Sequence, residues 1–319
     1  MAGLCYRRLS FEDLKGWADD DHQAALDVFA RSHGLLSDDW PPLPDAGSPA
    51  KTYFENAFTP VLIEDGAPML FTGYYEPELD ASPVQTGRHK YPAYAVPPDF
   101  DAAKPYCARR EIEEQELLAG QGLELAWFAD PVDLFFLQVQ GSGRLRFPDG
   151  SSRRLGFAAK NGHPYTSVGK LLVERGHVAA DEISPGAIRR WVAQNGPGIL
   201  WENDSFVFFR AIDDIADDDG PLGALGRSVT AGRSLAVDPD ATPLGAPVWI
   251  EKTGNRPMQR LMVAQDTGSA IKGAQRADIF FGTGADAGRI AGAIKDGGRM
   301  ITLLPRKMAD QLCGDQPDA

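Results

Sequence analysis

Glycine and proline interrupt this chain so often that they limit the folds it can adopt. The 319 residues include 34 glycines and 24 prolines. Glycine favours turns, and proline ends helices and is excluded from central strands. This composition predicts short strands joined by turns rather than a helical bundle. Because the chain is long enough for one large or two moderate domains, these strands can enclose a substantial core.

The charge balance excludes several classes of partner. Asp and Glu total 45 against 32 Lys and Arg, a net charge of −13, which repels nucleic acid and anionic lipid. No apolar run approaches the roughly 18 residues of a membrane helix, and the start lacks the apolar segment of a secretory signal. The cysteines Cys5, Cys107 and Cys313 are far apart and the five histidines form no ligand motif. We therefore expect no disulfide framework and no metal site.

Several segments of the first two thirds have distinct expected structures. Residues 1–35 read as helical, with a capping box at Ser10 and a stop at Gly34. Residues 69–77 and 205–210 read as strands, and residues 133–147 give the strongest strand signal, followed by a turn at Pro148-Asp149-Gly150 that makes a hairpin. Two short helices are expected from about 166 to 176 and from Ser184 to residue 196.

The last third reads as a series of short strands. An acidic run over 213–220 cannot bury itself and is interpreted as a surface linker at a domain boundary. After it, strands are expected at 235–238, 248–252, 260–265, 279–281 and 300–304. One helix, about 286–295, interrupts them.

Three short motifs suggest other functions. Ser167 and Lys170 with Lys252-Thr-Gly254 match penicillin-binding motifs, but a helix cap and a turn explain them better. Gly282-Thr-Gly284 resembles a dinucleotide fingerprint, yet too little chain follows for that fold. Asp266-Thr-Gly268 after an apolar strand resembles an aspartic peptidase, which needs a second such aspartate from a symmetric dimer. The peptidase stays open as an alternative.

Three aspartates at strand ends are the strongest candidates for chemistry. Asp238 and Asp266 follow apolar segments, and Asp278 opens one. If these strand ends converge, crowding and apolar walls would raise the pKa of one carboxyl. A carboxylic acid that stays protonated near neutral pH can protonate a glycosidic oxygen.

A set of motifs in fixed order resembles the membrane-bound lytic transglycosylase A family. In the last third, residues 236–250, Gln265-Asp-Thr-Gly-Ser-Ala-Ile-Lys-Gly273 and Ala277-Asp-Ile-Phe-Phe-Gly282 resemble its three-aspartate domain. Upstream motifs in the same order are Phe71-Thr-Gly-Tyr-Tyr-Glu-Pro77, Val139-Gln-Gly-Ser-Gly143, residues 160–170 and residues 205–209. The resemblance covers nearly the whole chain.

The resemblance implies a mainly β fold with a double-psi β-barrel domain, a second, smaller inserted β domain and a few short helices. Residues 1–77 and 213–319 would form the catalytic barrel, with a helical N-terminal part. Residues 78–212 would form the other wall of a glycan groove. The implied reaction cleaves the β-1,4 bond between N-acetylmuramic acid and N-acetylglucosamine and leaves 1,6-anhydromuramyl ends.

The resemblance also assigns site residues. Asp278 would be the catalytic acid and base, with Asp266 as its carboxylate neighbour. The groove residues implied by motif position are Thr72, Tyr74, Gln138, Gln140, Ser142, Lys160, Asn161 and Asp238. A cofactor-free monomer on the periplasmic side of the envelope is expected, associated with the outer membrane and binding peptidoglycan strands and wall-remodelling complexes. A non-catalytic glycan-binding barrel is the alternative from another class.

Overall fold

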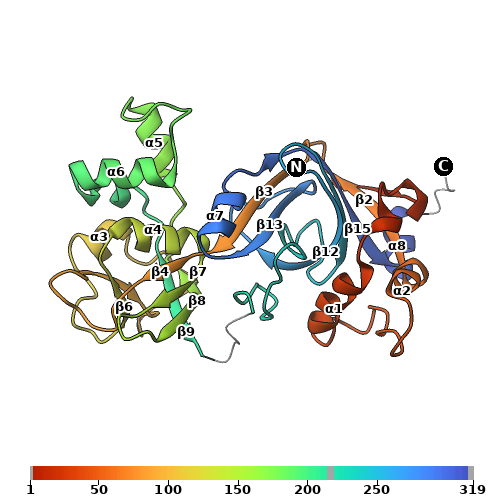
Figure 1. The fold of residues 1–319 in the computed structure, drawn as a ribbon, viewed down its shortest axis with the longest axis horizontal. Coiled ribbons are helices and arrows are strands. Elements are labelled where there is room, and N and C mark those ends of the chain that lie inside the picture. Colours follow the sequence, from red (N-terminus) through yellow and green to blue (C-terminus); the bar gives the residue numbers. More distant parts are fainter. Residues whose placement is uncertain (1–2, 214–218, 315–319) are drawn as a thin grey trace. The chain divides into compact units, whose positions relative to one another are not determined.

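The chain forms two compact units, and the second is inserted into the first. The computed structural model describes residues 3–213 and 219–314. One unit comprises Met1–Tyr75 with Ile215–Ala319, and the other comprises Glu76–Asp214 (Figure 1). Of the acidic run expected to be a linker, residues 214–218 lie outside the described residues. In the parts of the chain that are described, no helix is long and apolar enough to cross a membrane.

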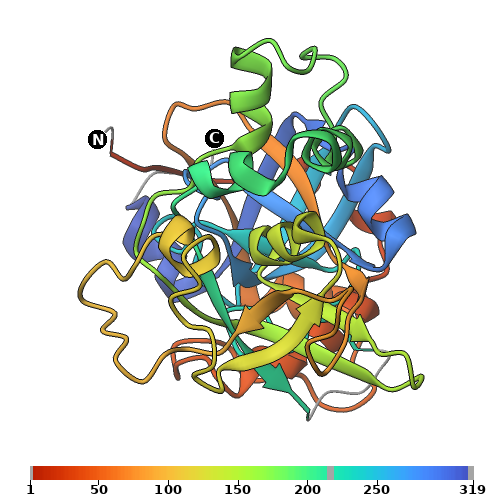
Figure 2. The same ribbon diagram turned by 90° about the vertical axis from the view of Figure 1, so that its left-hand side faces the viewer.

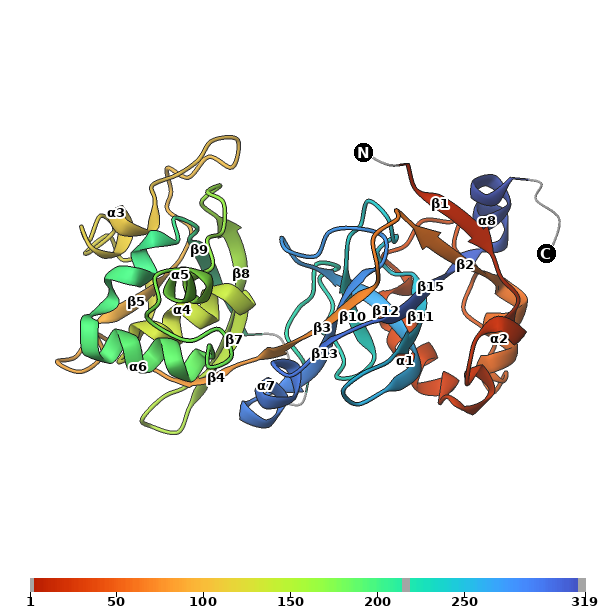
Figure 3. The same cartoon turned by 90° about the horizontal axis from the view of Figure 1, so that it is seen from above.

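A nine-stranded sheet organises the first unit. Its spatial order is β1-β2-β15-β11-β12-β10-β13-β3-β14, and Figure 3 shows β2, β15, β11 and β12 following one another across it. The strands are β1 (Cys5–Arg8), β2 (Phe58–Glu64), β3 (Leu70–Glu76), β10 (Ser234–Val237), β11 (Pro247–Lys252), β12 (Met258–Thr267), β13 (Arg276–Thr283), β14 (Lys295–Asp296) and β15 (Gly298–Pro305). Four helices accompany them: α1 (His22–His33), α2 (Ala50–Ala57), α7 (Ala285–Ala291) and α8 (Arg306–Cys313).

The mainly β class with few, short helices is confirmed. Among the described residues the strands are not closed into a barrel, because β1 and β14 stand at the two ends of the strand order with one neighbour each. The strands expected to form a barrel therefore form an open nine-stranded sheet. Most of its pairs are antiparallel, but β10 and β12 run parallel.

Helix α1 packs against this sheet and contributes to its hydrophobic core. The Asp21 side chain caps the helix by accepting a hydrogen bond from Ala24 N. The buried face includes Leu26 and Phe29, which join a cluster that also contains Trp249 of β11. Burying each such large apolar side chain stabilises the fold by roughly 1.5–3 kcal/mol.

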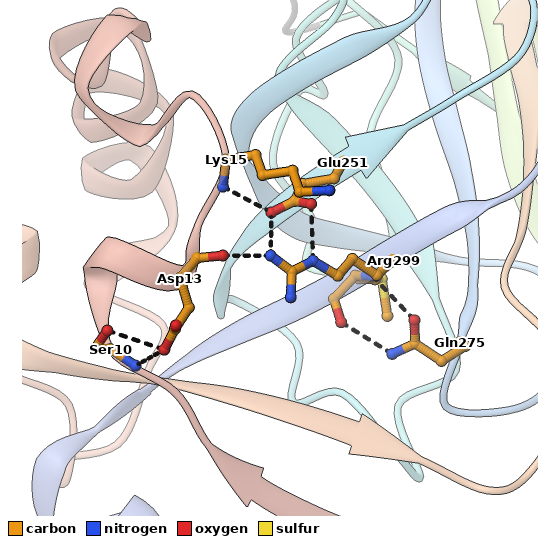
Figure 4. A network of polar contacts seen from close by, with 7 residues as sticks. Ser10, Asp13, Lys15, Glu251, Gln275 and Arg299 are labelled. Carbon is orange, nitrogen blue, oxygen red and sulfur yellow. Dashed lines mark hydrogen bonds and ion pairs between the residues drawn. The ribbon is translucent and has the colours of Figure 1, made fainter. Parts of the chain in front are cut away.

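A charged network ties the segment before α1 to the sheet (Figure 4). The Arg299 guanidinium donates to both carboxylate oxygens of Glu251, at 2.8 and 2.7 Å, and to the Asp13 carbonyl oxygen. Lys15 N also donates to Glu251, at 2.9 Å. The expected capping box is present, because Ser10 N and Oγ both donate to Asp13 Oδ2. These contacts hold the irregular N-terminal segment against β11 and β15.

The second unit combines two small sheets with helices. Figure 2 shows its strands and helices, and its larger sheet has the order β4-β7-β8-β9. The strands are β4 (Glu78–Asp80), β7 (Ser142–Arg146), β8 (Ser152–Lys160) and β9 (Val207–Ile212), with β5 (Tyr91–Tyr94) and β6 (Glu124–Phe128) as a separate pair. Its helices are α3 (Arg109–Glu113), α4 (Pro131–Gln140), α5 (Val168–Glu174) and α6 (Pro185–Asn195). A buried ion pair between Arg154 and Glu76 (2.7 Å) lies within this unit.

Two element predictions were wrong. Residues 131–140 form helix α4 instead of a strand; Asp130 caps it by accepting from Val132 N, and Pro131 occupies its first turn. Five of its ten residues are buried, including the consecutive Leu134 and Phe135, so the helical period is obscured. Residues 5–8 form strand β1 rather than a helix, because they pair with β2.

Most other element predictions are confirmed, with shifts of a few residues at their ends. Ser167 and Ser184 cap α5 and α6, and β7 and β8 form the expected hairpin, whose turn residue Gly150 has φ 84°. The late helix is shorter than expected, since α7 ends at Ala291 and β14 follows. Helices α2, α3 and α8 and strands β2, β4, β5 and β6 were not anticipated.

Candidate active site

Two of the three candidate aspartates face each other across one small residue. Strand β10 lies between β12 and β13, and its Ala236 is in register with Asp266 on β12 and with Asp278 on β13. Residues in register on neighbouring strands project from the same face of a sheet. The two carboxyl groups therefore flank the Ala236 methyl group, which is too small to separate them.

A β-bulge on β12 selects which side chain takes this place. The register shifts so that Leu235 pairs with Ala264 while Ala236 pairs with Asp266, leaving Gln265 as the extra residue. The buried Gln265 amide accepts from Ser234 Oγ at 2.5 Å and donates to Ser32 Oγ of α1 at 2.6 Å. Bulges re-aim side chains in this way beside functional sites. Gln265 thus points to the core, and Asp266 shares the face of Asp278.

The surroundings of Asp278 favour its protonated form. Burial raises the pKa of this carboxyl, and the charge of Asp266 raises it further. A hydrogen bond from Thr72 Oγ1 (2.7 Å) and the charge of Arg276 act in the opposite direction. The net pKa of Asp278 is above its ordinary value, while the residue stays partly exposed. Asp278 can therefore hold a proton and still reach a ligand.

Asp266 is held by backbone groups. Its Oδ1 accepts from Ala224 N at 3.0 Å and Thr267 N at 2.8 Å. Burial raises the pKa of Asp266. The hydrogen bonds from the two backbone N–H groups and the interaction with the Tyr74 hydroxyl lower it, but burial prevails. In turn, burial and the charge of Asp266 raise the pKa of Tyr74 well above its ordinary value. Tyr74 therefore remains a neutral hydroxyl beside the two acids.

Gly223 permits the loop that reaches Asp266. A Cβ at this position would lie 2.6 Å from Gln265 O, 2.9 Å from Val229 Cγ1 and 3.3 Å from Asp266 Cβ. The contact with the Gln265 carbonyl oxygen is far shorter than an ordinary van der Waals distance. Only glycine allows the chain to pass close enough for the next residue, Ala224, to donate its N–H to the carboxylate.

Asp238 makes different contacts from the other two aspartates. It accepts from Gly273 N at 2.8 Å and Lys272 Nζ at 3.0 Å. Burial would raise its pKa, but these hydrogen bonds outweigh burial and lower it. Among the described residues it has no hydrogen bond with Asp266 or Asp278. Its contacts hold the loop that precedes β13, so a direct contact with substrate stays a prediction.

The remaining candidate residues lie in the second unit, around one end of α4 and of β8. Gln138 and Gln140 are in the last turn of α4, Ser142 opens β7 after Gly141, and Lys160 ends β8. Gln138 is buried, and its amide nitrogen and oxygen have no hydrogen-bond partner among the described residues. A substrate group could satisfy such an amide.

Asn161 has a clear structural role. It is fully buried, its Nδ2 donates to Cys107 O (3.0 Å) and Asp204 O (2.8 Å), and its Oδ1 accepts from Phe206 N (2.8 Å). These bonds join three loops of the second unit. They leave the amide little capacity to bind a ligand.

The sequence reasoning missed three residues of the site. Ala236 spaces the acids, Ala224 binds Asp266 through its backbone, and Arg276 places a positive charge on the face of Asp278. Only Arg276 carried a usable signal, since it precedes Asp278 by two residues on a strand. Within the described parts of the chain, no three His, Cys, Asp or Glu side chains gather as they would around a metal ion.

Two family models match the chain. The "MltA specific insert domain" matches residues 70–210, and the "3D domain" matches residues 233–304. The first therefore covers most of the second unit, and the second covers β10 to β15 except the end of β15. Asp266 and Asp278 lie within the 3D domain match.

Known proteins resemble the chain over most of its length. Membrane-bound lytic murein transglycosylase A of Vibrio cholerae is 34% identical over 249 residues, 74% of this chain but only 65%, less than two thirds, of that protein. A solved structure of membrane-bound lytic murein transglycosylase from Agrobacterium tumefaciens has a TM-score of 0.82 and 34% identity, covering 96% of this chain and 99% of that one. A structure of E. coli MltA with bound chitohexaose has a TM-score of 0.74 and 29% identity, covering 92% and 90%. With matches of this extent and the two aspartates within the 3D domain, the chain belongs to the membrane-bound lytic murein transglycosylase A family.

Proposed function

We propose that this protein is a lytic transglycosylase of the cell envelope that cleaves peptidoglycan glycan strands. The observation that carries the proposal is the partly exposed Asp278 carboxyl, whose pKa is raised by burial and by Asp266 beside it. Such a carboxyl is the reagent needed to protonate a glycosidic oxygen. The names of the relatives, lytic murein transglycosylase A, support the same reaction.

In the proposed mechanism one carboxyl serves as both acid and base. Protonated Asp278 gives its proton to the oxygen of the β-1,4 bond between N-acetylmuramic acid and N-acetylglucosamine as the bond to C1 breaks. The resulting carboxylate then takes the proton of the muramyl C6 hydroxyl while O6 bonds to C1. The products are a 1,6-anhydromuramyl end and a free N-acetylglucosamine 4-hydroxyl, and no water is consumed.

A second carboxylate is not needed as a nucleophile or as a base for water. The attacking hydroxyl belongs to the substrate ring and is already positioned. Asp266 has a different proposed task. It lies on the same face as Asp278 and, through its charge, keeps the Asp278 proton in place until the leaving oxygen takes it. Thr72 orients the acid by donating to its Oδ1.

The proposed substrate contacts are the residues implied by motif position that keep free polar groups or lie beside the acids. We assign glycan binding to Tyr74 and Thr72 near the acids, and to Gln138, Gln140, Ser142 and Lys160 in the second unit. The bound chitohexaose in the E. coli relative supports a glycan ligand. The relatives described as membrane-bound support an envelope location. Action as a monomer, without cofactor and in contact with wall-remodelling complexes, belongs to the same proposal.

Digestion of purified sacculi tests the reaction directly. We expect soluble muropeptides with 1,6-anhydromuramyl ends, 18 Da lighter than hydrolysis products, as measured by mass spectrometry. Asp278→Asn should reduce their release at least about a thousandfold and leave the thermal melting curve cooperative. Reducing ends in place of anhydro ends would make the protein a hydrolase.

The two alternative functions give different results in the same experiment. A glycan-binding protein would bind sacculi and release nothing, with or without Asp278→Asn. An aspartic peptidase would cut stem peptides and leave glycan strands intact. The site does not favour the peptidase: that reaction needs Asp266 to share a proton with the same residue of a second copy, whereas Asp266 Oδ1 accepts from Ala224 N and Thr267 N of its own chain.

A further inference from the structure

Arg276 lies on the same face of β13 as the candidate acid. Along this strand Arg276 and Asp278 are partly exposed, while Ala277 and Ile279 between and after them are fully buried. The Cα atoms of residues two apart on a strand are separated by about 6.4–6.8 Å. The Arg276 charge acts on the Asp278 carboxyl. The strand therefore places Arg276 about one sugar ring from Asp278, the residue that would protonate a glycosidic oxygen.

The Arg276 guanidinium has bonding capacity that the protein does not use. Its Nη1 donates to Ala277 O at 2.8 Å and to Leu70 O at 3.3 Å. Its Nε and Nη2 have no hydrogen bond, and no carboxylate lies within ion-pair distance, among the described residues. Burial lowers the pKa of this group. A half-buried cation without an ion pair is unfavourable for folding, so a functional use is indicated.

The free side of the guanidinium has the geometry to bind a carboxylate. Nη1 is occupied, which leaves Nε and Nη2 as two parallel donors, the arrangement that binds carboxylate oxygens in pairs. Muramic acid differs from glucosamine by a lactyl ether on O3 that ends in a carboxyl group. On the ring whose C1 bond is cut, O3 is two carbons from C1, within the Arg276–Asp278 spacing.

We propose that Arg276 binds the lactyl group of the muramic acid residue at the cleavage point and favours strands in which its carboxylate is free. This inference rests on the proposed transglycosylase function. In strands that carry stem peptides the same carboxyl is an amide, which accepts hydrogen bonds but has no charge. Arg276 thus offers a local positive charge for an anionic substrate on a protein whose net charge is −13. Peptide-free glycan is the preferred substrate class.

The test compares two forms of one glycan. Strands freed of peptides by an amidase carry lactyl carboxylates, and coupling part of the sample to methylamine converts these to uncharged amides. We expect the wild type to have a kcat/KM about tenfold or more higher on the carboxylate form, the effect of one charge-assisted pair. Arg276→Gln should remove most of that ratio, and Arg276→Lys should keep part of it.

A matched variant and a neutral ligand serve as controls. Arg260 on β12 is also half-buried and donates to a carbonyl, Gly232 O at 3.4 Å; Arg260→Gln should leave the carboxylate ratio unchanged. Chitohexaose has no lactyl group, so its affinity for Arg276→Gln should equal that for the wild type. Equal affinity would also show that the variant is folded.

Two results would overturn the inference. One is an unchanged carboxylate ratio in Arg276→Gln. The other is an equal loss on both strand forms together with a shifted pH profile, which would mean that Arg276 acts on Asp278 instead of on substrate. Calorimetric binding of the two strand forms to Asp278→Asn measures lactyl recognition without turnover. Failure of the transglycosylase reaction itself would appear separately, as the absence of anhydro products from the wild type.

Discussion

Asp266 and Asp278 lie opposite the same residue, Ala236, on the two strands that flank β10. The shared register puts both carboxyl groups on one face of the sheet with only a methyl group between them. Their titrations are therefore linked, because ionising one makes the other harder to ionise. Two aspartates that are twelve residues apart in sequence thus act as one acidic unit, although their hydrogen-bond partners differ.

Replacing Asp266 by asparagine should move the pH profile of the reaction. The charge of Asp266 raises the pKa of Asp278, and the reactive form of Asp278 is protonated. Without that charge the pKa of Asp278 falls, so the alkaline limb of kcat/KM moves to lower pH. Anhydromuropeptide release measured from pH 4 to 8 checks this. A limb that stays in place, or moves to higher pH, would remove Asp266 from this role.

Asp278→Asn should stabilise the protein at neutral pH. Because the folded-state pKa of Asp278 is raised above its ordinary 3.8, the folded state binds more protons than the unfolded state between these two values. Stability therefore falls as pH rises through this range, and asparagine removes the loss. The melting temperature of the variant should exceed that of the wild type at pH 7 and approach it near pH 3.5. The exposed Asp286→Asn should show no comparable pH-dependent gain; an equal gain there would point to net charge instead.

Gly223→Ala should reduce both stability and activity by moving the loop that binds Asp266. The added Cβ would meet Gln265 O at 2.6 Å, so the loop must move and Ala224 N must withdraw from Asp266. Overpacking of this kind costs about 1–3 kcal/mol, and activity should fall together with it. Denaturant unfolding and product release measure the two effects. Gly87, where a Cβ would meet nothing within 4 Å, supplies the matched Gly→Ala control; equal losses in both variants would exclude the loop contact as the cause.

The sequence could predict those elements whose ends are set by residues close together in the chain. The helix caps at Ser167 and Ser184 and the hairpin turn at Gly150 depend on residues within a few positions of each other, and the strands carrying Asp266 and Asp278 are apolar runs with clear ends. The family motifs added the expectation that these aspartates converge. Convergence was therefore predictable from resemblance and from strand ends together.

The rest depends on contacts that are distant in sequence. The bulge at Gln265 exists because its amide bonds to Ser32 and Ser234, which no local pattern reveals. Helix α4 was misread because Leu134 and Phe135 are both buried by different neighbours. Asp130 and Pro131 are a local signal for the start of this helix. The apolar run that follows them favoured a strand, and the prediction followed the apolar run.

We expect Asp238 to be a positioning residue whose contribution to stability depends on pH. Burial would raise its pKa, but hydrogen bonds from Gly273 N and Lys272 lower it below the ordinary 3.8. Its stabilisation is therefore present above that pH and lost as pH falls through the folded-state pKa. Asp238→Ala should cost about 1–3 kcal/mol at pH 7, the cost of leaving a buried backbone donor unpaired, and progressively less as pH falls below 3.8. Activity should fall as well, because the loop it holds leads into Arg276 and Asp278.

The control for Asp238 separates its two hydrogen bonds. Lys272 is exposed, and the pair it forms with Asp238 is open to solvent on the lysine side, so Lys272→Ala should cost much less stability than Asp238→Ala. Asp238→Asn keeps an acceptor for Gly273 N and should rescue part of the loss in both stability and kcat. If Asp238→Ala instead weakened chitohexaose binding while leaving the unfolding free energy and the pH dependence unchanged, Asp238 would contact the glycan, and the loop between β12 and β13 would need another support.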